Sequence, residues 1–297
     1  MLKKRRGLIS VVMVLSVIAF VGFSIAPIVD SIVRANQASS SPSPTPMQTT
    51  TAKQSDLQAQ ARGYELVLQR EPDNQTALKG LLQVRLELIQ AKQGEIKDVI
   101  GPLERLSKLN PENGEYAILL AQAKDYSGDR EGAAQAYRSV LTLKPGDVKA
   151  LQGLVNLLLN QKRPEAAIGL LQDTLKAAPA ANLAKAGSID VNSVQLILGQ
   201  VYADQKRFDE AIAIYDEGIK ADNKDFRPLL AKAIVLKEKG KTEDAKVFFT
   251  KASDLAPANF KDQIKQLASG NPAPTSSPTT TTKKASPTPQ ASPTKKN

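Results

Sequence analysis

The stretch LGQVYADQKRFDEAIAIYDEG, residues 198–218, decides the fold of this 297-residue chain. Its apolar residues return at steps of three and four, which is the period of an amphipathic helix. Small residues such as Gly199 and Ala211 allow two helices to approach closely, and Tyr202 and Tyr215 supply the bulk that fills the space between them. The stretch therefore predicts a pair of packed helices.

The same helix pair recurs along the chain. The marks of the recurrence are Pro72, Pro111, Pro145, Pro179, Asn223 and Pro257; the first four are 39, 34 and 34 residues apart, and the last two are 34 apart. Four units carry small and bulky residues at identical offsets before the mark: Ala133, Tyr137, Val140, Leu143; Ala167, Leu171, Thr174, Ala177; Ala211, Tyr215, Gly218, Ala221; and Ala245, Phe249, Ala252, Leu255. Because proline lacks an amide donor and restrains the preceding residue, each proline is expected to end a helix.

A 34-residue period with these offsets resembles the tetratricopeptide repeat family. The residues that carry the resemblance are Leu198, Gly199, Tyr202, Phe208, Asp209, Glu210, Ala211, Tyr215 and Gly218, with turns at Gly128-Asp129 and Gly240-Lys241. The resemblance implies an all-α, right-handed superhelical solenoid of helix-turn-helix repeats, whose concave wall is lined by the first helix of each unit.

The repeats give a domain plan. A tetratricopeptide domain is expected over 54–269: a half-repeat at 54–74, repeats at about 75–113, 114–147, 148–181, 192–225 and 226–259, and a closing helix at 260–269. Additional residues near 91–94 should lengthen one turn. An insertion of about ten residues within 180–191 should form a surface loop that ends in Asp190 as a helix cap.

The resemblance also indicates where a partner would bind. Equivalent places on the first helices hold Gln83, Gln122, Asn156 and Gln200, with Ile234 last; such a row of amides can hydrogen-bond a peptide backbone of any sequence. The predicted partner-binding groove comprises Lys79, Gln83, Gln122, Asp125, Tyr126, Gln152, Asn156, Asn160, Gln200, Asp204, Arg227, Leu230 and Ile234. The alternative is that these polar residues only cover a solvated helix face.

A second set of residues is predicted to pack the repeats. It comprises Ala133, Tyr137, Ala167, Leu171, Gly199, Tyr202, Ala211, Tyr215, Gly218, Ala245, Phe249 and Ala252.

The family's clamp for chaperone tails is doubtful in this chain, because Gln83 and Leu119 stand where that clamp has asparagines.

An N-terminal membrane anchor is also predicted. Basic residues at positions 3–6 precede an uncharged apolar run, and residues 8–29 are long enough to cross a bilayer as a transmembrane helix that serves as a signal anchor. The cations place residues 1–7 in the cytoplasm and the repeats on the extracytoplasmic side, in a periplasm or lumen. A cleavable signal peptide, which would leave a secreted protein, and a nucleic-acid-binding basic run are the alternatives.

The two remaining segments are rich in Ser, Pro and Thr. A linker at 30–53 and a tail at 270–297 that also carries lysines offer little apolar surface, and both are expected to be disordered. Ten of the 40 basic residues but only one of the 30 acidic residues lie outside 54–282, so the repeats are nearly neutral despite a formal charge of +10. This balance argues against a nucleic-acid partner.

The chain has no histidine and no cysteine, which removes the side chains most used for zinc, thiol and proton-transfer chemistry. We therefore expect no enzyme, no cofactor and no metal. The leading hypothesis is a membrane-anchored scaffold that binds a protein or peptide, in assembly or biogenesis of a membrane complex. The alternative is a self-associating structural or envelope-spacer protein without a peptide ligand.

Overall fold

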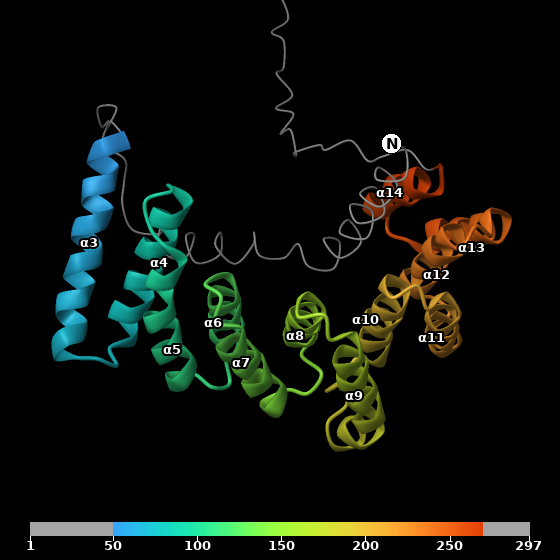
Figure 1. Ribbon diagram of the computed structural model, residues 1–297, viewed down its shortest axis with the longest axis horizontal. Helices are drawn as coiled ribbons and strands as arrows, with labels where there is room; N and C mark the ends of the chain where they lie inside the picture. Colours follow the sequence, from blue (N-terminus) through green and yellow to red (C-terminus); the bar gives the residue numbers. More distant parts are fainter. Residues whose placement is uncertain (1–49, 270–297) are drawn as a thin grey trace, which may run out of the picture.

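The computed structural model describes residues 50–269, and in this range every regular element is helical. The elements are α3 (Thr50–Arg70), α4 (Gln75–Gln90), η1 (Ile96–Val99), α5 (Ile100–Leu109), α6 (Gly114–Tyr126), α7 (Arg130–Leu143), α8 (Val148–Asn160), α9 (Pro164–Ala184), α10 (Val191–Asp204), α11 (Phe208–Ala221), α12 (Phe226–Glu238), α13 (Thr242–Leu255) and α14 (Ala258–Ser269). They follow one another along an open curved array, with α3 at one end and α14 at the other (Figure 1). The all-α solenoid expected from the sequence is confirmed.

The helices alternate between two roles. Each of α4, α6, α8, α10 and α12 is the first helix of a unit, and each packs against the helix that follows it. Three pairs of first helices also touch: α6 with α8, α8 with α10, and α10 with α12. We call the side formed by these five first helices the inner wall.

Short polar side chains fix where the first helices begin. Asp147 accepts a hydrogen bond from the amide of Ala150 at 2.9 Å, and Asp190 accepts one from the amide of Ser193 at 3.2 Å. Each bond satisfies an amide that has no partner within the helix, which favours a helix start at that residue. The prediction that Asp190 is a helix cap is confirmed.

Aromatic side chains set the spacing between helices. An added Cβ at Gly80, Gly153 or Gly199 would collide with the ring of Tyr64, Tyr137 or Tyr215, respectively. Only glycine leaves room for a ring at these crossings, so each tyrosine lies directly against the backbone of a neighbouring helix. All twelve residues predicted to pack the repeats are buried.

The buried side chains form one long core with a smaller core at each end. The long core runs from Leu78 to Val235, one end core joins α3 to α4, and the other joins α12, α13 and α14. This layout is typical of a stacked repeat, in which each unit contacts only its neighbours.

The prediction that Pro179 ends its helix is wrong, because α9 continues through it to Ala184. The insertion is accordingly less of a loop than expected. Asn182, within the added turn, donates to the carbonyl of Ile189 at 2.9 Å and accepts from the amide of the same residue at 2.9 Å. Ile189 is buried, and its backbone lies against Gly146. The burial and the paired hydrogen bonds stabilise the continued helix against the bond that proline removes.

Two further boundaries differ from expectation. Helix α3 begins at Thr50, so the last residues assigned to the linker 30–53 are helical, and the half-repeat is longer at its N-terminal end. The additional residues of the second unit include the 3₁₀ helix η1, which contacts α4, α5 and α6 and lies where α4 and α6 would otherwise meet.

The predicted membrane span at 8–29, the cytoplasmic residues 1–7 and the tail at 270–297 lie outside the described residues. Among the helices between Thr50 and Ser269, none combines the length and the apolar character that a bilayer crossing needs.

A candidate protein-binding wall

All thirteen predicted groove residues lie on first helices. They are Lys79 and Gln83 on α4; Gln122, Asp125 and Tyr126 on α6; Gln152, Asn156 and Asn160 on α8; Gln200 and Asp204 on α10; and Arg227, Leu230 and Ile234 on α12. Because consecutive first helices from α6 to α12 touch, most of these residues share the inner wall. The structure therefore places these residues on one row of helices, and their use in binding stays a prediction.

These residues differ in exposure, and most of them are half-buried. Lys79, Gln122, Tyr126 and Asn160 are exposed, and 82% of the Tyr126 surface is accessible. Leu230 is different: only 9% of its surface is exposed, and it belongs to the core formed with α13 and α14. Leu230 thus packs the end of the array and offers little surface to a guest chain, contrary to its predicted place in the groove.

The predicted row of amides is partly used within the chain. Gln83 donates to Glu87 at 3.3 Å, and Gln200 donates to Asp204 at 2.9 Å. Both partners follow four residues later on the same helix, a spacing that the sequence displays and that brings side chains together. The side-chain amide of Gln122 makes no hydrogen bond with any described residue, and the same holds for the side-chain amide of Asn156. The middle of the wall, on α6 and α8, therefore offers amides that a guest could bind.

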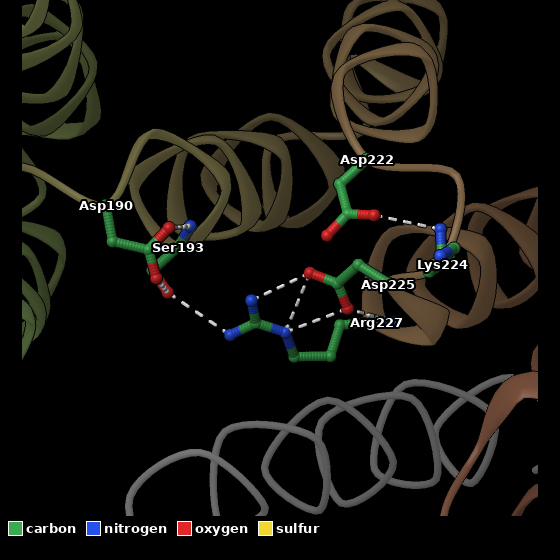
Figure 2. Close-up of polar contacts among 6 residues, drawn as sticks. All are labelled: Asp190, Ser193, Asp222, Lys224, Asp225 and Arg227. Carbon is green, nitrogen blue, oxygen red and sulfur yellow. Dashed lines mark hydrogen bonds and ion pairs between the residues drawn. The ribbon is translucent and has the colours of Figure 1, made fainter. Parts of the chain in front are cut away.

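One end of the wall is a closed polar cluster (Figure 2). Arg227 binds Asp225 through Nε at 3.0 Å and Nη2 at 2.7 Å, and its Nη1 donates to the hydroxyl of Ser193 at 3.2 Å. Ser193 in turn donates to Asp190, so the cluster joins the starts of α10 and α12. The Asp225 and Asp190 carboxylates raise the pKa of Arg227, and the largest cause is the hydrogen bond that Arg227 donates to Asp225. Arg227 was predicted as a groove residue, but its guanidinium mainly ties two repeats together.

Sequence reasoning did not identify Ser193 and Asp225 as parts of this cluster. The sequence did contain one signal for the cluster. Asp190 and Asp225 each stand directly before a predicted first helix, and aspartates at such positions cap helices. Arg227, two residues after Asp225, then lies within reach of the cap.

A partly buried carboxylate lies at the opposite end of α10. Burial raises the pKa of Asp204, the nearby Glu238 raises it further, and the hydrogen bond from Gln200 lowers it. Glu238 itself pairs with Lys206. Groups of the chain itself therefore stabilise the charged form of the Asp204 carboxylate only in part. A hydrogen-bond donor on a guest would offset part of its desolvation penalty.

Burial also raises the pKa of two tyrosines behind the inner wall. It raises the pKa of Tyr137 to about 12, with the Asp125 charge as a smaller cause. Burial raises the pKa of Tyr215 as well, and there the smaller cause is Asp204. Both tyrosines stay protonated in the physiological range, which is consistent with a packing role.

The described residues contain no group of three or more histidine, cysteine, aspartate or glutamate side chains placed to hold a metal ion.

Comparisons with known proteins add to this geometry. Over 195 residues, the chain is 29% identical to protein SLOW GREEN 1, chloroplastic, from Arabidopsis thaliana; the match covers 66% of this chain and 59% of that protein. The chain thus spans about three fifths of the length of that curated relative.

Solved structures with a similar arrangement include MamA from Desulfovibrio magneticus, with 18% identity, a TM-score of 0.38, and coverage of 66% of this chain and 94% of MamA. Yeast Tom70 aligns with 13% identity and a TM-score of 0.49, over 76% of this chain and 44% of Tom70.

Sequence models of the tetratricopeptide repeat match residues 126–187, 193–225 and 226–259. These matched residues cover the helices from α7 to α13 and most of the inner wall. These matches support the resemblance seen in the spacing of prolines and aromatic residues: residues 126–187 and 193–259 match the tetratricopeptide repeat.

Proposed function

We propose that this chain is a membrane-anchored scaffold that holds a partner protein or peptide along its inner wall, in the assembly or biogenesis of a membrane complex. The observation that carries the proposal is the middle of the wall. There Gln122, Asn156 and the exposed ring of Tyr126 lie on the touching helices α6 and α8, and the two amides make no hydrogen bond to described residues.

The chemistry of this region suits an extended peptide. A side-chain amide both donates and accepts, so Gln122 and Asn156 can pair with a peptide group of a guest without reading its sequence. Tyr126 adds a rigid apolar face with a polar tip, the type of side chain that is enriched at binding sites. Asp204 extends the surface with a carboxylate that favours a donor group.

The membrane part of the proposal rests on the sequence. Basic residues at 3–6 and the apolar run at 8–29 are typical of a signal anchor with a cytoplasmic N-terminus. The repeats would then act on the extracytoplasmic side, tethered near a partner in or at the membrane.

Site-specific photocrosslinking tests the proposal. A benzophenone amino acid at Gln122 or Asn156 is expected to give one discrete adduct with a protein in native membranes. The same group at Arg138 or Asp173, exposed positions on the second helices α7 and α9, is the matched control. The adduct at Gln122 should weaken when Asn156 and Gln200 are replaced by alanine. Equal adducts from the inner and outer positions would contradict the proposal.

A further inference from the structure

The first helix of the described array has a face that no described residue covers. In each complete unit the second helix is buried between its own first helix and the next one, but α3 is a second helix without a first helix before it. Figure 1 shows α3 at the end of the array, with α4 as its neighbour. Its inward residues Leu57, Ala61, Tyr64 and Leu68 form the small core with α4.

Equivalent positions in the complete units show what the uncovered face lacks. Gln60 and Val67 stand 12 and five residues before Pro72. The residues at the same offsets in the last four units are all buried: Ala133, Ala167, Ala211 and Ala245 at the first offset, and Val140, Thr174, Gly218 and Ala252 at the second. On α3, 40% of the surface of Val67 is exposed, and 61% of that of Leu66. An added Cβ at Gly63 would meet no described atom within 4 Å.

Among the described residues, no first helix precedes α3. In the unit that contains Tyr137, the second helix begins at Arg130, seven residues before the tyrosine. Helix α3 begins at Thr50, well before the corresponding position, so it runs through the place where the turn to a first helix would lie. The sequence before it carries prolines at 42, 44 and 46, which lack the amide donors that a helix needs. The described residues of this unit thus leave the face uncovered.

The pattern on the face is self-complementary. The exposed residues Asp56, Ala59, Gln60, Gly63, Leu66, Val67 and Arg70 recur at steps of three and four along one side of α3. If two copies of α3 lie antiparallel and cross at Gly63, Asp56 of each copy faces Arg70 of the other. Ala59 then faces Val67, and Gln60 faces Leu66. The glycine permits close approach at the crossing, and each half of the contact places an acid opposite a base.

From this pattern we infer that a second copy of this chain covers the outer face of α3, in an antiparallel two-fold contact centred on Gly63. A contact of this kind uses the same patch on both partners and closes at two chains, so it does not propagate into a fibre. The inner wall of each copy stays open, because α3 lies at the end of the array. The inference therefore goes beyond the proposed scaffold and pairs two such scaffolds at their N-terminal ends.

Cysteine crosslinking of the full chain is the direct test, because the sequence has no cysteine of its own. The full-length Gly63→Cys variant, purified in detergent micelles and mildly oxidised, is expected to become a disulfide-linked dimer in most of the protein. Gln58→Cys is the matched control: it is exposed on the same helix but lies on another side, and it should remain monomeric on a non-reducing gel. Equal crosslinking of the two variants overturns the inference. So does a disulfide from position 63 to a different protein in native membranes.

Charge reversal tests the antiparallel register independently. Asp56→Arg alone and Arg70→Asp alone should each lower the dimer fraction, measured by light scattering of the full chain with detergent subtracted, by at least threefold. The double variant should recover it, because both pairs are then restored with opposite polarity. Leu66→Asp should abolish the dimer while helix content by circular dichroism stays unchanged. A mass that is monomeric at all concentrations in the unmodified chain, or a double variant no better than the singles, overturns the inference.

Dimer formation through α3 can be tested separately from partner binding at the inner wall. The Leu66→Asp variant should keep the photocrosslink at Gln122, and alanine at Gln122, Asn156 and Gln200 should leave the dimer intact. Loss of the dimer with an intact crosslink counts against this inference alone.

Discussion

At the scale of single residues, the volumes of the side chains that pack between neighbouring helices match one another. Several bulky residues of the second helices have a partner 16 positions away on a first helix, and the two sizes compensate. Tyr137 has Ala121 sixteen residues before it and Gly153 sixteen residues after it; Leu171 has the larger Val155 before it. Interiors pack at crystal-like density, so a ring needs a glycine or alanine beside it, whereas a leucine leaves room for valine.

This matching predicts the effect of a single methyl group. The Cβ of Gly153→Ala would collide with the Tyr137 ring, and overpacking of this kind costs about 1–3 kcal/mol, so the variant should be less stable than the unmodified protein. Alanine's better helix propensity, about 1 kcal/mol, offsets only part of that loss. Urea unfolding followed by circular dichroism measures the difference. Gly169→Ala, in a helix where the added Cβ meets no described atom within 4 Å, is the control and should leave stability equal or higher.

Asp204 gives a pH-dependent prediction. Its pKa is raised in the folded protein, chiefly by burial, so its contribution to stability is fully present below the unfolded pKa and is lost as pH rises through the folded value. Asp204→Asn keeps an acceptor for Gln200 and has no proton to lose. Its melting temperature relative to that of the unmodified protein should therefore rise from pH 3 to pH 7. A difference that stays constant over this range would show that the carboxylate carries no such cost.

The sequence predicted which residues are buried between the helices better than it predicted which groove residues keep unpaired polar groups. Packing follows from spacing and size, as at Tyr215 and Gly199, and both can be read from a repeat. Binding depends on which polar groups the chain leaves unused. Gln83 and Gln200 have carboxylates four residues later, a visible signal that removes them from a simple amide row. The burial of Leu230 depends on helices later in the chain, and no local pattern around it shows that contact.

At the scale of elements, the position where a helix ends depends on tertiary contacts more than on local signals such as proline. Leu143 and Leu255 each end a helix shortly before a proline, as expected, but α9 passes through Pro179. A proline lowers the stability of a helix interior by about 3 kcal/mol, which other interactions can offset. Here the offset comes from Asn182 and the buried Ile189, which lie beyond the proline and outside the 34-residue pattern.

Helix α14 depends on one lysine of the inner wall. Lys237 on α12 donates to the carbonyls of Leu267 and Ala268, the last turn of α14, and a cation there also suits the helix dipole. Lys237→Ala should lower the local stability of α14 by about 1 kcal/mol, seen as faster hydrogen exchange in peptides from 258–269. Lys239→Ala, which removes an exposed ion pair with Asp209, is the control and should leave α14 unchanged. Equal exchange in the two variants would contradict the capping role.

At the scale of the whole molecule, stability is shared among three cores that follow one another along the array. Contacts between neighbouring units stabilise such a chain. A destabilising substitution should therefore loosen only the helices of the core in which it lies. The long core links α4 through α11 and reaches α12, whereas the C-terminal core involves α12 to α14. A guest bound to α6 and α8 would therefore stabilise the long core most directly.

Two matched core substitutions test this division. Leu154→Ala in the long core and Ile264→Ala in the C-terminal core each truncate an almost fully buried side chain and should cost about 2–5 kcal/mol locally. Hydrogen exchange should show that Ile264→Ala loosens α12 to α14 while α6 to α8 keep their protection. Leu154→Ala should loosen α6 to α10, because their buried side chains belong to one connected cluster. If Ile264→Ala instead lowered protection uniformly from α4 to α14, the array would unfold as a single unit. The tether, the guest and the second copy would then all act on one global equilibrium.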